Sequence, residues 1–384
     1  MHLPKSKTTL ALFCKVVDNF GDIGICWRLA RQLEEEHHIA VTLWVDDLVS
    51  FKKICPELTL DSKQQQLNTI CVRHWSSQDE QFQINEIADI VIEFFGCDIP
   101  PDYIATMAKC ERPPIWINLE GLSAEEWVEG CHTLPSSHPQ YPLTKYFFFP
   151  GFTSKTGGLL HEKPISQQQQ DFLQSEQTRR DFLHTLGVPS TESGNFTVSM
   201  FCYPHAPVQE LFNIWEHGHE PITCLVPVGV ANSTVEKFLA QEAKPGACRQ
   251  RCNLVVRVIP FVPQQDYDKL LWSCDFNFVR GEDSFVRAQW ALQPFIWHIY
   301  PQDENLHHKK LRAFLQKHAA TTEVSKTMSL LWNAAIETDN WQELWSALRT
   351  ELPEIRNRSA AWQRQMQENG DMTANLMNFV NSKR

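Results

Sequence analysis

Strand-type apolar runs that alternate with stretches of helical spacing constrain the fold of this chain most. The run Thr9–Val17 is mostly apolar, and beyond it Ile25, Leu29 and Leu33 recur on one face of an expected helix. Strands that alternate with helices in this way form a parallel sheet with helices on both faces. Further strand-type runs in the first half of the chain lie at Ile39–Val45, Asp89–Phe95, Ile115–Leu119 and Tyr146–Phe149.

A second series of strand-type runs predicts a second doubly wound unit. The polar, low-complexity stretch Ser166–Arg180 is typical of a solvated helix or linker, and we expect a domain boundary near it. With 384 residues, two domains are expected, at residues 1–175 and 190–358, and a helical segment at about 359–384 is expected to pack back on the first. The runs of the second series lie at Phe196–Phe201, Ile222–Val226, Leu254–Ile259, Asp275–Val279 and Phe295–Tyr300.

Charge and composition exclude several classes of protein. The net charge of −11 argues against a nucleic-acid-binding protein, because such proteins normally carry a basic surface. No apolar run reaches the roughly 18 residues of a membrane span, and the short apolar stretch Leu10–Cys14 is followed at once by Lys15, unlike a signal peptide. We therefore expect a cytoplasmic protein whose 12 cysteines are reduced thiols. Cys248 and Cys252 have no second pair at zinc-ligand spacing, so no metal site is expected.

The first candidate site is the sequence DNFGDIG, Asp18–Gly24, which directly follows the first strand-type run. Gly21 and Gly24 allow a tight turn and a close approach of the backbone to a ligand. The dinucleotide fingerprint G-x-G-x-x-G and the P-loop signature are both absent. Two interpretations of Asp18 and Asp22 stay open, because they could be a carboxylate pair at a ligand site or could cap the following helix.

The second candidate site is Arg280–Ser284, between the strand-type run Asp275–Val279 and the helical spacing of Phe285–Leu292. Asp283 or Ser284 is a natural N-cap residue for that helix. The N–H groups at a helix N-terminus, together with the helix dipole, form a site for anions.

Arg280 adds a charge to this second site that can bind a phosphate group in a bidentate manner. Glu282 or Asp283 could then accept hydrogen bonds from a sugar. These residues predict a diphosphate site that needs no metal, although a capped helix with an Arg–Glu surface pair is the simpler alternative.

A third stretch, Phe261–Asp266, follows the strand-type run Leu254–Ile259. Its location suits aromatic and amide contacts with a nucleotide base. The alternative is a loop without a ligand.

Five long motifs stand out along the chain. They are DNFGDIG (Asp18–Gly24), KYFFFPGFTSKTGGLL (Lys145–Leu160), FVPQQDYDKLL (Phe261–Leu271), RGEDSFVRAQ (Arg280–Gln289) and WHIYPQDENLH (Trp297–His307). Taken together, these motifs resemble the EarP family of protein-arginine rhamnosyltransferases, which modify translation elongation factor P. The resemblance extends over most of the chain, in the same order and with the same spacing.

The resemblance implies a GT-B fold, with two facing Rossmann-like domains, an active site between them and a C-terminal helical segment. It implies an N-terminal acceptor domain and a C-terminal donor domain. The implied donor is dTDP-β-L-rhamnose, and the acceptor is one arginine at a loop tip in the N-terminal domain of elongation factor P. The implied reaction inverts the anomeric centre without a metal or other cofactor, and it activates elongation factor P for ribosomes stalled at polyproline.

The resemblance also implies roles for individual residues. Asp22 matches the catalytic carboxylate of the family, Asp18 its essential neighbour and Glu282 a second functional carboxylate. Gly121 stands where relatives tend to carry an aromatic residue. The implied donor-binding residues are Asn19, Phe20, Gly21, Tyr203, Phe261, Gln264, Gln265, Asp266, Arg280, Gly281, Glu282, Asp283 and Ser284.

The implied chemistry gives a reason for paired carboxylates. A guanidinium has a pKa above about 12, so its deprotonation at neutral pH costs roughly 7–8 kcal/mol. Asp18 and Asp22 could hold the group and localise its charge, and one of them could take the proton as the C–O bond breaks. A transferase acting on a small molecule or glycan, and a binding module without catalysis, are the alternatives. The presence of both carboxylates speaks against the binding module.

Overall fold

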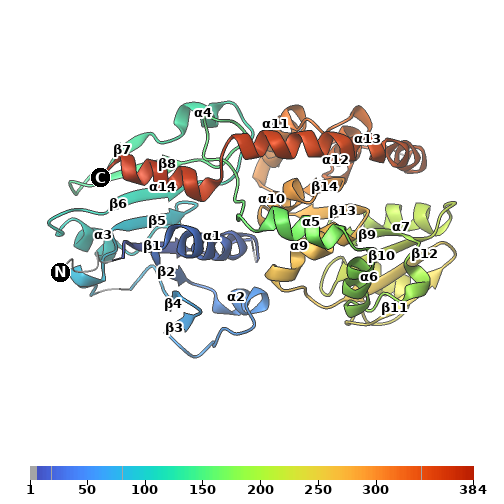
Figure 1. Cartoon of the computed structure of the whole chain (residues 1–384), viewed down its shortest axis with the longest axis horizontal. Coiled ribbons are helices and arrows are strands. Elements are labelled where there is room, and N and C mark those ends of the chain that lie inside the picture. The colour runs from blue at the N-terminus through green and yellow to red at the C-terminus, as the bar shows by residue number, and fades with distance from the viewer. Residues whose placement is uncertain (1–6, 19, 80, 339) are drawn as a thin grey trace. The chain divides into compact units, whose positions relative to one another are not determined.

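The protein is described here by a computed structural model that covers residues 7–384 apart from residues 19, 80 and 339 (Figure 1). Its residues divide into two compact units. The first consists of Met1–Glu162 together with Met366–Arg384, and the second is Lys163–Gln365. Each unit has a mostly parallel sheet with helices packed against it.

The first unit contains an eight-stranded sheet in the order β3-β4-β2-β1-β5-β6-β8-β7. Its strands are parallel except β3 and β7, which pair antiparallel with β4 and β8 at the two edges. The strands are β1 Thr9–Cys14, β2 Ala40–Val45, β3 Gln64–Leu67, β4 Ile70–His74, β5 Ile90–Phe94, β6 Ile115–Leu119, β7 Pro135–Ser137 and β8 Thr144–Phe148.

The side chains of the central strands point alternately to the two faces of this sheet and so provide apolar residues on both. Ala11 and Phe13 of β1 pack with Tyr103 and Met107 of α3 in one buried cluster. The intervening residues of β1 point to the opposite face, and α1 contacts both β1 and β2. The helices of the first unit are α1 Gly21–His37, α2 Leu48–Ile54, η1 Ile84–Glu86, α3 Pro101–Met107, α4 Trp127–Cys131 and α14 Met372–Ser382.

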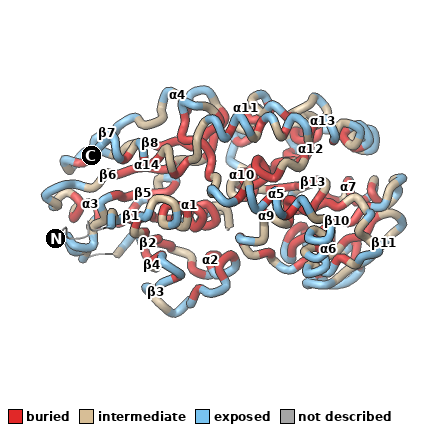
Figure 2. The backbone as a smooth tube through the Cα atoms, in the orientation of Figure 1, coloured by how far each residue is buried: buried red, intermediate tan, exposed pale blue. Residues whose placement is uncertain are grey.

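The second unit contains a six-stranded sheet in the order β11-β12-β10-β9-β13-β14, parallel except for the edge strand β11. Its central strand β10 is buried at every position, as expected for a parallel strand covered on both faces (Figure 2). The strands are β9 Phe196–Met200, β10 Ile222–Pro227, β11 Cys248–Arg251, β12 Leu254–Ile259, β13 Phe276–Arg280 and β14 Phe295–His298.

Tryptophans fill one face of the second sheet. Trp215 of α7, Trp332 of α12 and Trp345 of α13 pack in one cluster with strand residues such as Phe278. Residues of α6 and α9 pack with β10 and β12 in another cluster. The helices of this unit are α5 Ile165–Leu173, α6 Glu176–Thr185, η2 Ser190–Glu192, α7 Val208–Glu216, α8 Asn232–Leu239, α9 Gln264–Ser273, α10 Asp283–Trp290, η3 Asp303–Asn305, α11 His307–Lys317, α12 Glu323–Trp332 and α13 Trp341–Glu368, whose last residues belong to the first unit.

The division between the units differs from the expected boundaries at 175 and 359. Gln169 of α5 donates to the carbonyl oxygen of Trp290 (2.9 Å), so α5 is part of the second unit rather than the end of the first. Trp362 likewise donates to Gln289 Oε1 (2.8 Å) and stays with the second unit. The chain returns to the first unit only at Met366, and Figure 1 shows α14 lying with the elements of that unit.

Both sheets have a point at which the strand order reverses. In the first unit the chain runs from β1 through β2 to β4, then continues on the other side of β1 with β5. In the second unit the same reversal occurs between β9 and β13. Ligands of open α/β sheets bind outside the carboxyl ends of the strands at such points. The loops after β1, β9 and β13 are therefore the places to look for a site.

All 12 cysteines are free thiols. Among the described residues, no helix has the length and apolarity required to cross a membrane.

Candidate active site

Asp22 is a buried carboxylate at the start of α1, in the first unit. The residue is only 4% exposed, and its Oδ2 accepts hydrogen bonds from the backbone N–H groups of Val17 (2.7 Å) and Asp18 (2.8 Å). Helix α1 begins at Gly21, earlier than the expected Ile25, and its N-cap Phe20 makes no side-chain capping bond. Asp22 therefore does not cap the helix from the preceding loop. Instead, the Asp22 side chain holds the preceding loop in place from within the first turn of α1.

The surroundings of Asp22 make it a stronger base than an exposed aspartate. Burial raises the pKa of its carboxyl group, the two backbone N–H bonds lower it, and the neighbouring charges of Asp18 and Asp46 raise it further. Asp46 directly follows β2, and its Oδ1 accepts from the backbone N–H of Val16 (2.8 Å). Sequence analysis missed Asp46, although its position directly after a predicted strand was a usable signal.

A tight turn brings Asp18 close to the start of α1. The backbone N–H of Gly21 donates to the carbonyl oxygen of Asp18 (2.7 Å). A Cβ atom on Gly21 would lie 2.9 Å from Asp18 Oδ2, so only glycine leaves the carboxylate where it is. Phe20 is half-buried beside them, and Lys53 Nζ lies 5.4 Å from its ring centroid. Asn19, the remaining candidate in this turn, lies outside the described residues.

In the second unit, Arg280 and Tyr203 come together at the carboxyl ends of β13 and β9. The Arg280 guanidinium lies 4.9 Å from the centroid of the Tyr203 ring and 4.4 Å from that of Phe201. Its NH1 group also donates to the carbonyl oxygen of Cys202 (3.1 Å). Arg280 is the last residue of β13, and Gly281 turns the chain with a φ of 62°. The left-handed φ favours glycine at this position.

The N-terminus of α10 differs from the predicted capping. The helix begins at Asp283, and its N-cap is Glu282, whose side chain makes no capping bond. Ser284 Oγ accepts from the backbone N–H of Arg280 (3.0 Å) and donates to the carbonyl oxygen of the same residue, so it braces the loop instead of capping. The prediction that Asp283 or Ser284 caps this helix is therefore wrong. The dipole of α10 still favours an anion at this end.

The third candidate stretch is only partly a loop, because α9 begins at Gln264. Gln264 is buried and Phe261 is half-buried, whereas Gln265 is exposed. Asp266 forms an ion pair with Lys269 one turn further along the helix (2.7 Å). Gln264 is therefore the buried polar residue of this stretch, and Asp266 is engaged on the helix surface.

Three successive contacts hold the N-terminal turns of α9 and α10 side by side. Gln264 Nε2 donates to Asp283 Oδ2 (3.1 Å), and Tyr267 forms a side-chain hydrogen bond with Ser284. One turn further along each helix, Arg287 donates to both carboxylate oxygens of Asp268 (2.7 and 3.1 Å). The Arg287 side chain is 0% exposed and that of Asp268 is 6% exposed. Sequence analysis missed this ion pair, which fixes the place of the two helix ends relative to each other.

The end of β14 contributes aromatic residues to the same group. His298 is the last residue of that strand, and the rings of His298 and Tyr300 lie 5.2 and 5.7 Å from the ring of Tyr203. The sequence placed both residues inside a longer strand, Phe295–Tyr300, so they were not considered as site residues. Their position at a strand end adjacent to β13 was the available signal.

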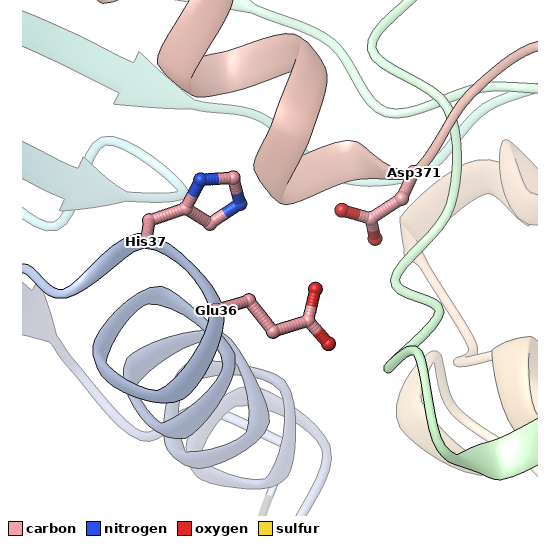
Figure 3. Close-up of side chains that lie close together, drawn as sticks. All are labelled: Glu36, His37 and Asp371. Carbon is pink, nitrogen blue, oxygen red and sulfur yellow. The ribbon is translucent and has the colours of Figure 1, made fainter.

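Glu36, His37 and Asp371 form a group whose ligand atoms all lie within 4.8 Å of one another, close enough for a metal ion (Figure 3). Asp371 is the N-cap of α14, with Oδ2 accepting from Ala374 N (2.9 Å), and its Oδ1 accepts from His161 N (3.1 Å). Glu36 is fourteen residues from Asp22 along α1, about 21 Å at 1.5 Å per residue. The group thus lies apart from the carboxylates of the candidate site.

Comparisons with known proteins identify the class and the family. The family model described as "Elongation-Factor P (EF-P) rhamnosyltransferase EarP" matches residues 10–381. Protein-arginine rhamnosyltransferases of Pseudomonas putida and Pseudomonas aeruginosa are 44% and 41% identical to this chain, over 97% and 96% of its length and 98% and 97% of theirs.

Solved structures agree with the sequence comparisons. A structure described as "Structural basis for EarP-mediated arginine glycosylation of translation elongation factor EF-P" has a TM-score of 0.68 and 30% identity, covering 98% of this chain and 100% of that one. A UGT transferase from Siraitia grosvenorii in complex with UDP has the same fold at a TM-score of 0.52 and 11% identity, covering 98% of this chain and 99% of that one.

Two doubly wound units with a C-terminal helical segment, together with the match to solved glycosyltransferases, define a glycosyltransferase of the GT-B class. Within that class, the chain belongs to the EarP family of protein-arginine rhamnosyltransferases. The expected fold class and enzyme class are thereby confirmed.

Proposed function

We propose that this protein transfers L-rhamnose from dTDP-β-L-rhamnose to one arginine of translation elongation factor P, with inversion at the anomeric carbon. We further propose that it works in the cytoplasm and thereby activates elongation factor P for ribosomes stalled at polyproline. The observation that carries the proposal is Asp22, a buried carboxylate of raised pKa in a chain of the EarP family.

Asp22 is the proposed general base. An arginine nitrogen attacks the anomeric carbon of the sugar, a C–N bond forms, and the bond from that carbon to the diphosphate oxygen breaks. The proton lost by the arginine nitrogen passes to Asp22, while dTDP leaves with the electron pair. A carboxylate of raised pKa accepts this proton more readily than an ordinary aspartate. Asp18, held beside it by the turn at Gly21, is proposed to bind the guanidinium and localise its charge.

The second unit is proposed to hold the donor. The negative charge that develops on the leaving dTDP is stabilised by Arg280 and by the N-terminus of α10. Tyr203 and Phe261 are proposed to contact the nucleotide, and Glu282, at the N-cap of α10, to accept hydrogen bonds from the sugar. With a cation and a helix dipole at one place, the diphosphate is proposed to need no metal.

Mass spectrometry of purified elongation factor P, after incubation with this protein and a panel of nucleotide sugars, tests the proposal. We expect one deoxyhexose on a single arginine with dTDP-rhamnose and none with UDP-glucose. Anomeric analysis of the product by NMR should show inversion, and EDTA should leave the rate unchanged. Transfer from another nucleotide sugar, retention of configuration or loss of rate in EDTA would contradict the corresponding part. Transfer only to a small molecule or glycan would support the alternative acceptor class.

A further inference from the structure

Two histidines outside the predicted site residues meet beside Tyr203 in the second unit. His205 follows β9 by a short loop and is exposed, whereas His298 ends β14 and is 1% exposed. Their Nε2 atoms are 3.0 Å apart. The strands that they follow or end, β9 and β14, lie on either side of β13, which ends in Arg280.

The contacts of His298 determine where both imidazoles carry their protons. The backbone N–H of Tyr203 donates to His298 Nδ1 (3.2 Å), so that nitrogen is an acceptor and holds no proton. A neutral His298 then has its proton on Nε2 and donates it to His205 Nε2. His205 must accept at Nε2, and in the neutral form its own proton is therefore on Nδ1.

The environment keeps the buried member of the pair neutral. Burial lowers the pKa of His298 to about 3, and the positive charges of His205, Arg280 and His307 act in the same direction. Burial also lowers the pKa of His205. Protonation of His205 at Nε2 would set two N–H groups against each other at 3.0 Å, so the pair itself opposes a charged His205.

The geometry around His205 points to an anionic ligand. Its ring is parallel to that of Tyr203, with an interplanar angle of 1° and centroids 6.3 Å apart. The Arg280 guanidinium lies over the same Tyr203 ring at 4.9 Å. Among the described residues, no hydrogen bond engages His205 Nδ1. An exposed N–H donor of fixed direction therefore lies in the same group of rings as the cation that we propose to bind the diphosphate.

We propose that His205 is a ligand-binding residue whose Nδ1–H donates to a phosphoryl oxygen of a nucleoside diphosphate held at Arg280, and that His298 is the positioning residue that selects this tautomer. The inference rests on the proposed function for its ligand, because the donor there is a nucleoside diphosphate sugar. The arrangement provides a neutral hydrogen bond to the diphosphate in addition to the charge of Arg280 and the dipole of α10.

Nitrogen-15 NMR of the full chain at pH 8, without ligand, tests the tautomer directly. We expect His205 to be protonated on Nδ1, and we expect it to revert to the Nε2-protonated form that predominates in free histidine when His298→Phe removes the donor. An Nε2-protonated His205 in the unaltered chain would overturn the inference, whether or not the variant folds.

Calorimetry with dTDP and with thymidine tests the phosphate contact. We expect His205→Ala to weaken dTDP binding about tenfold, the effect of one hydrogen bond to a charged group, and to leave thymidine binding unchanged. His205→Asn, whose amide N–H can replace Nδ1–H, should recover part of the affinity. His217→Ala, an exposed histidine of the same unit, is the matched control.

The outcomes separate this inference from the proposed function. If the chain binds UDP or another nucleoside diphosphate better than dTDP, and His205→Ala weakens that binding, the inference stands and the proposed donor is wrong. If dTDP binds the His205→Ala chain as tightly as the unaltered one, the inference is wrong and the proposed donor stands. An equal loss for dTDP and thymidine, or no binding of any nucleoside diphosphate, would also overturn it.

Discussion

Asp22 obtains its chemical character from the backbone around it. Two N–H groups of the preceding loop bind the same oxygen atom, so the carboxylate is held in one orientation. Burial and the neighbouring charges of Asp18 and Asp46 raise its pKa nevertheless. A residue that is both positioned and unusually basic is suited to accept a proton in a transition state.

We predict that Asp22→Asn abolishes most turnover without disturbing the fold or the donor. The amide oxygen can still accept from the N–H groups of Val17 and Asp18, but the residue can no longer take a proton. Loss of a general base typically costs about 10²–10⁴ in rate. Transfer to elongation factor P should fall in this range, while dTDP-rhamnose affinity by calorimetry stays within error.

Asp61→Asn, the same chemical change at an exposed position, is the control. In the unaltered chain the rate should rise with pH as Asp22 loses its proton, with a midpoint above that of an ordinary aspartate. A large loss of donor affinity with turnover preserved would argue against the role of base.

Gly21→Ala is predicted to lower activity by displacing Asp18. The added Cβ would lie 2.9 Å from Asp18 Oδ2, the end of a side chain that can rotate away. We therefore expect a melting temperature close to that of the unaltered chain. The rate should fall at least about tenfold, because the acceptor guanidinium would lose the partner proposed for it. Gly130→Ala, where an added Cβ meets nothing within 4 Å, is the control. Unchanged activity in Gly21→Ala would show that the exact position of Asp18 is unimportant.

At the scale of elements, the pairing of α9 with α10 determines where the proposed anion site lies. The dipole of α10 is useful only if its first turn is fixed next to Arg280, and the contacts Gln264–Asp283 and Asp268–Arg287 fix it. The contact between Asp268 and Arg287 is a buried bidentate ion pair. Such a pair contributes little net stability, but loss of one partner leaves the other charge buried and uncompensated.

We predict that Arg287→Ala destabilises the protein by about 3–5 kcal/mol, because it leaves Asp268 buried without its partner. Urea denaturation measures this loss. Arg358→Ala removes an arginine from the exposed i,i+4 pair with Glu354, and it should cost no more than about 0.5 kcal/mol. Similar effects of the two substitutions would show that burial does not govern the Asp268–Arg287 pair.

At the scale of the whole molecule, both units contain histidines kept neutral by burial. Burial lowers the pKa to about 4 for His132 in the first unit, and to about 3 for His298 and His318 in the second. In the unfolded chain these groups titrate near pH 6.5. A lowered pKa in the folded state contributes stability that is fully present above the unfolded value and is lost as pH falls toward the folded value. The raised pKa of Asp22 has the opposite sign and acts at lower pH.

We therefore predict that the free energy of unfolding is level above about pH 7 and declines below about pH 6.5. His298 alone contributes up to about 1.4 kcal/mol per pH unit in the window between its two pKa values. Urea denaturation at pH 7.5, 6.0 and 5.0 measures the decline, which should be shallower in His298→Phe. A pH-independent free energy of unfolding across this range would contradict the prediction.

The sequence alone predicted the strands that are buried on both faces, since their apolar runs are continuous. β6 and β12 have the predicted bounds, and β1, β2, β5 and β9 differ from them only at the ends. Four strands escaped prediction. β3, β7 and β11 are edge strands of mainly polar sequence, and β4 has only five residues, two of which are Arg73 and His74. Polar edge strands also discourage pairing with other chains. The polar composition that prevented the prediction of these strands therefore also protects the sheet edges.

The local sequence pattern predicted the two-unit α/β organisation and the candidate loops after β1, β12 and β13, because strands, turns and helices each have a typical order of neighbouring residues. The loop after β9 was indicated only by the family resemblance, through Tyr203. Tertiary structure alone decided the raised pKa of Asp22, the pairing of Asp268 with Arg287 and the contact between His205 and His298. These properties depend on burial and on partners far away in the sequence, such as Tyr203 and His298 (3.2 Å apart, N to Nδ1). The local periodicity of the sequence does not indicate such contacts, because only the folded chain brings the atoms together.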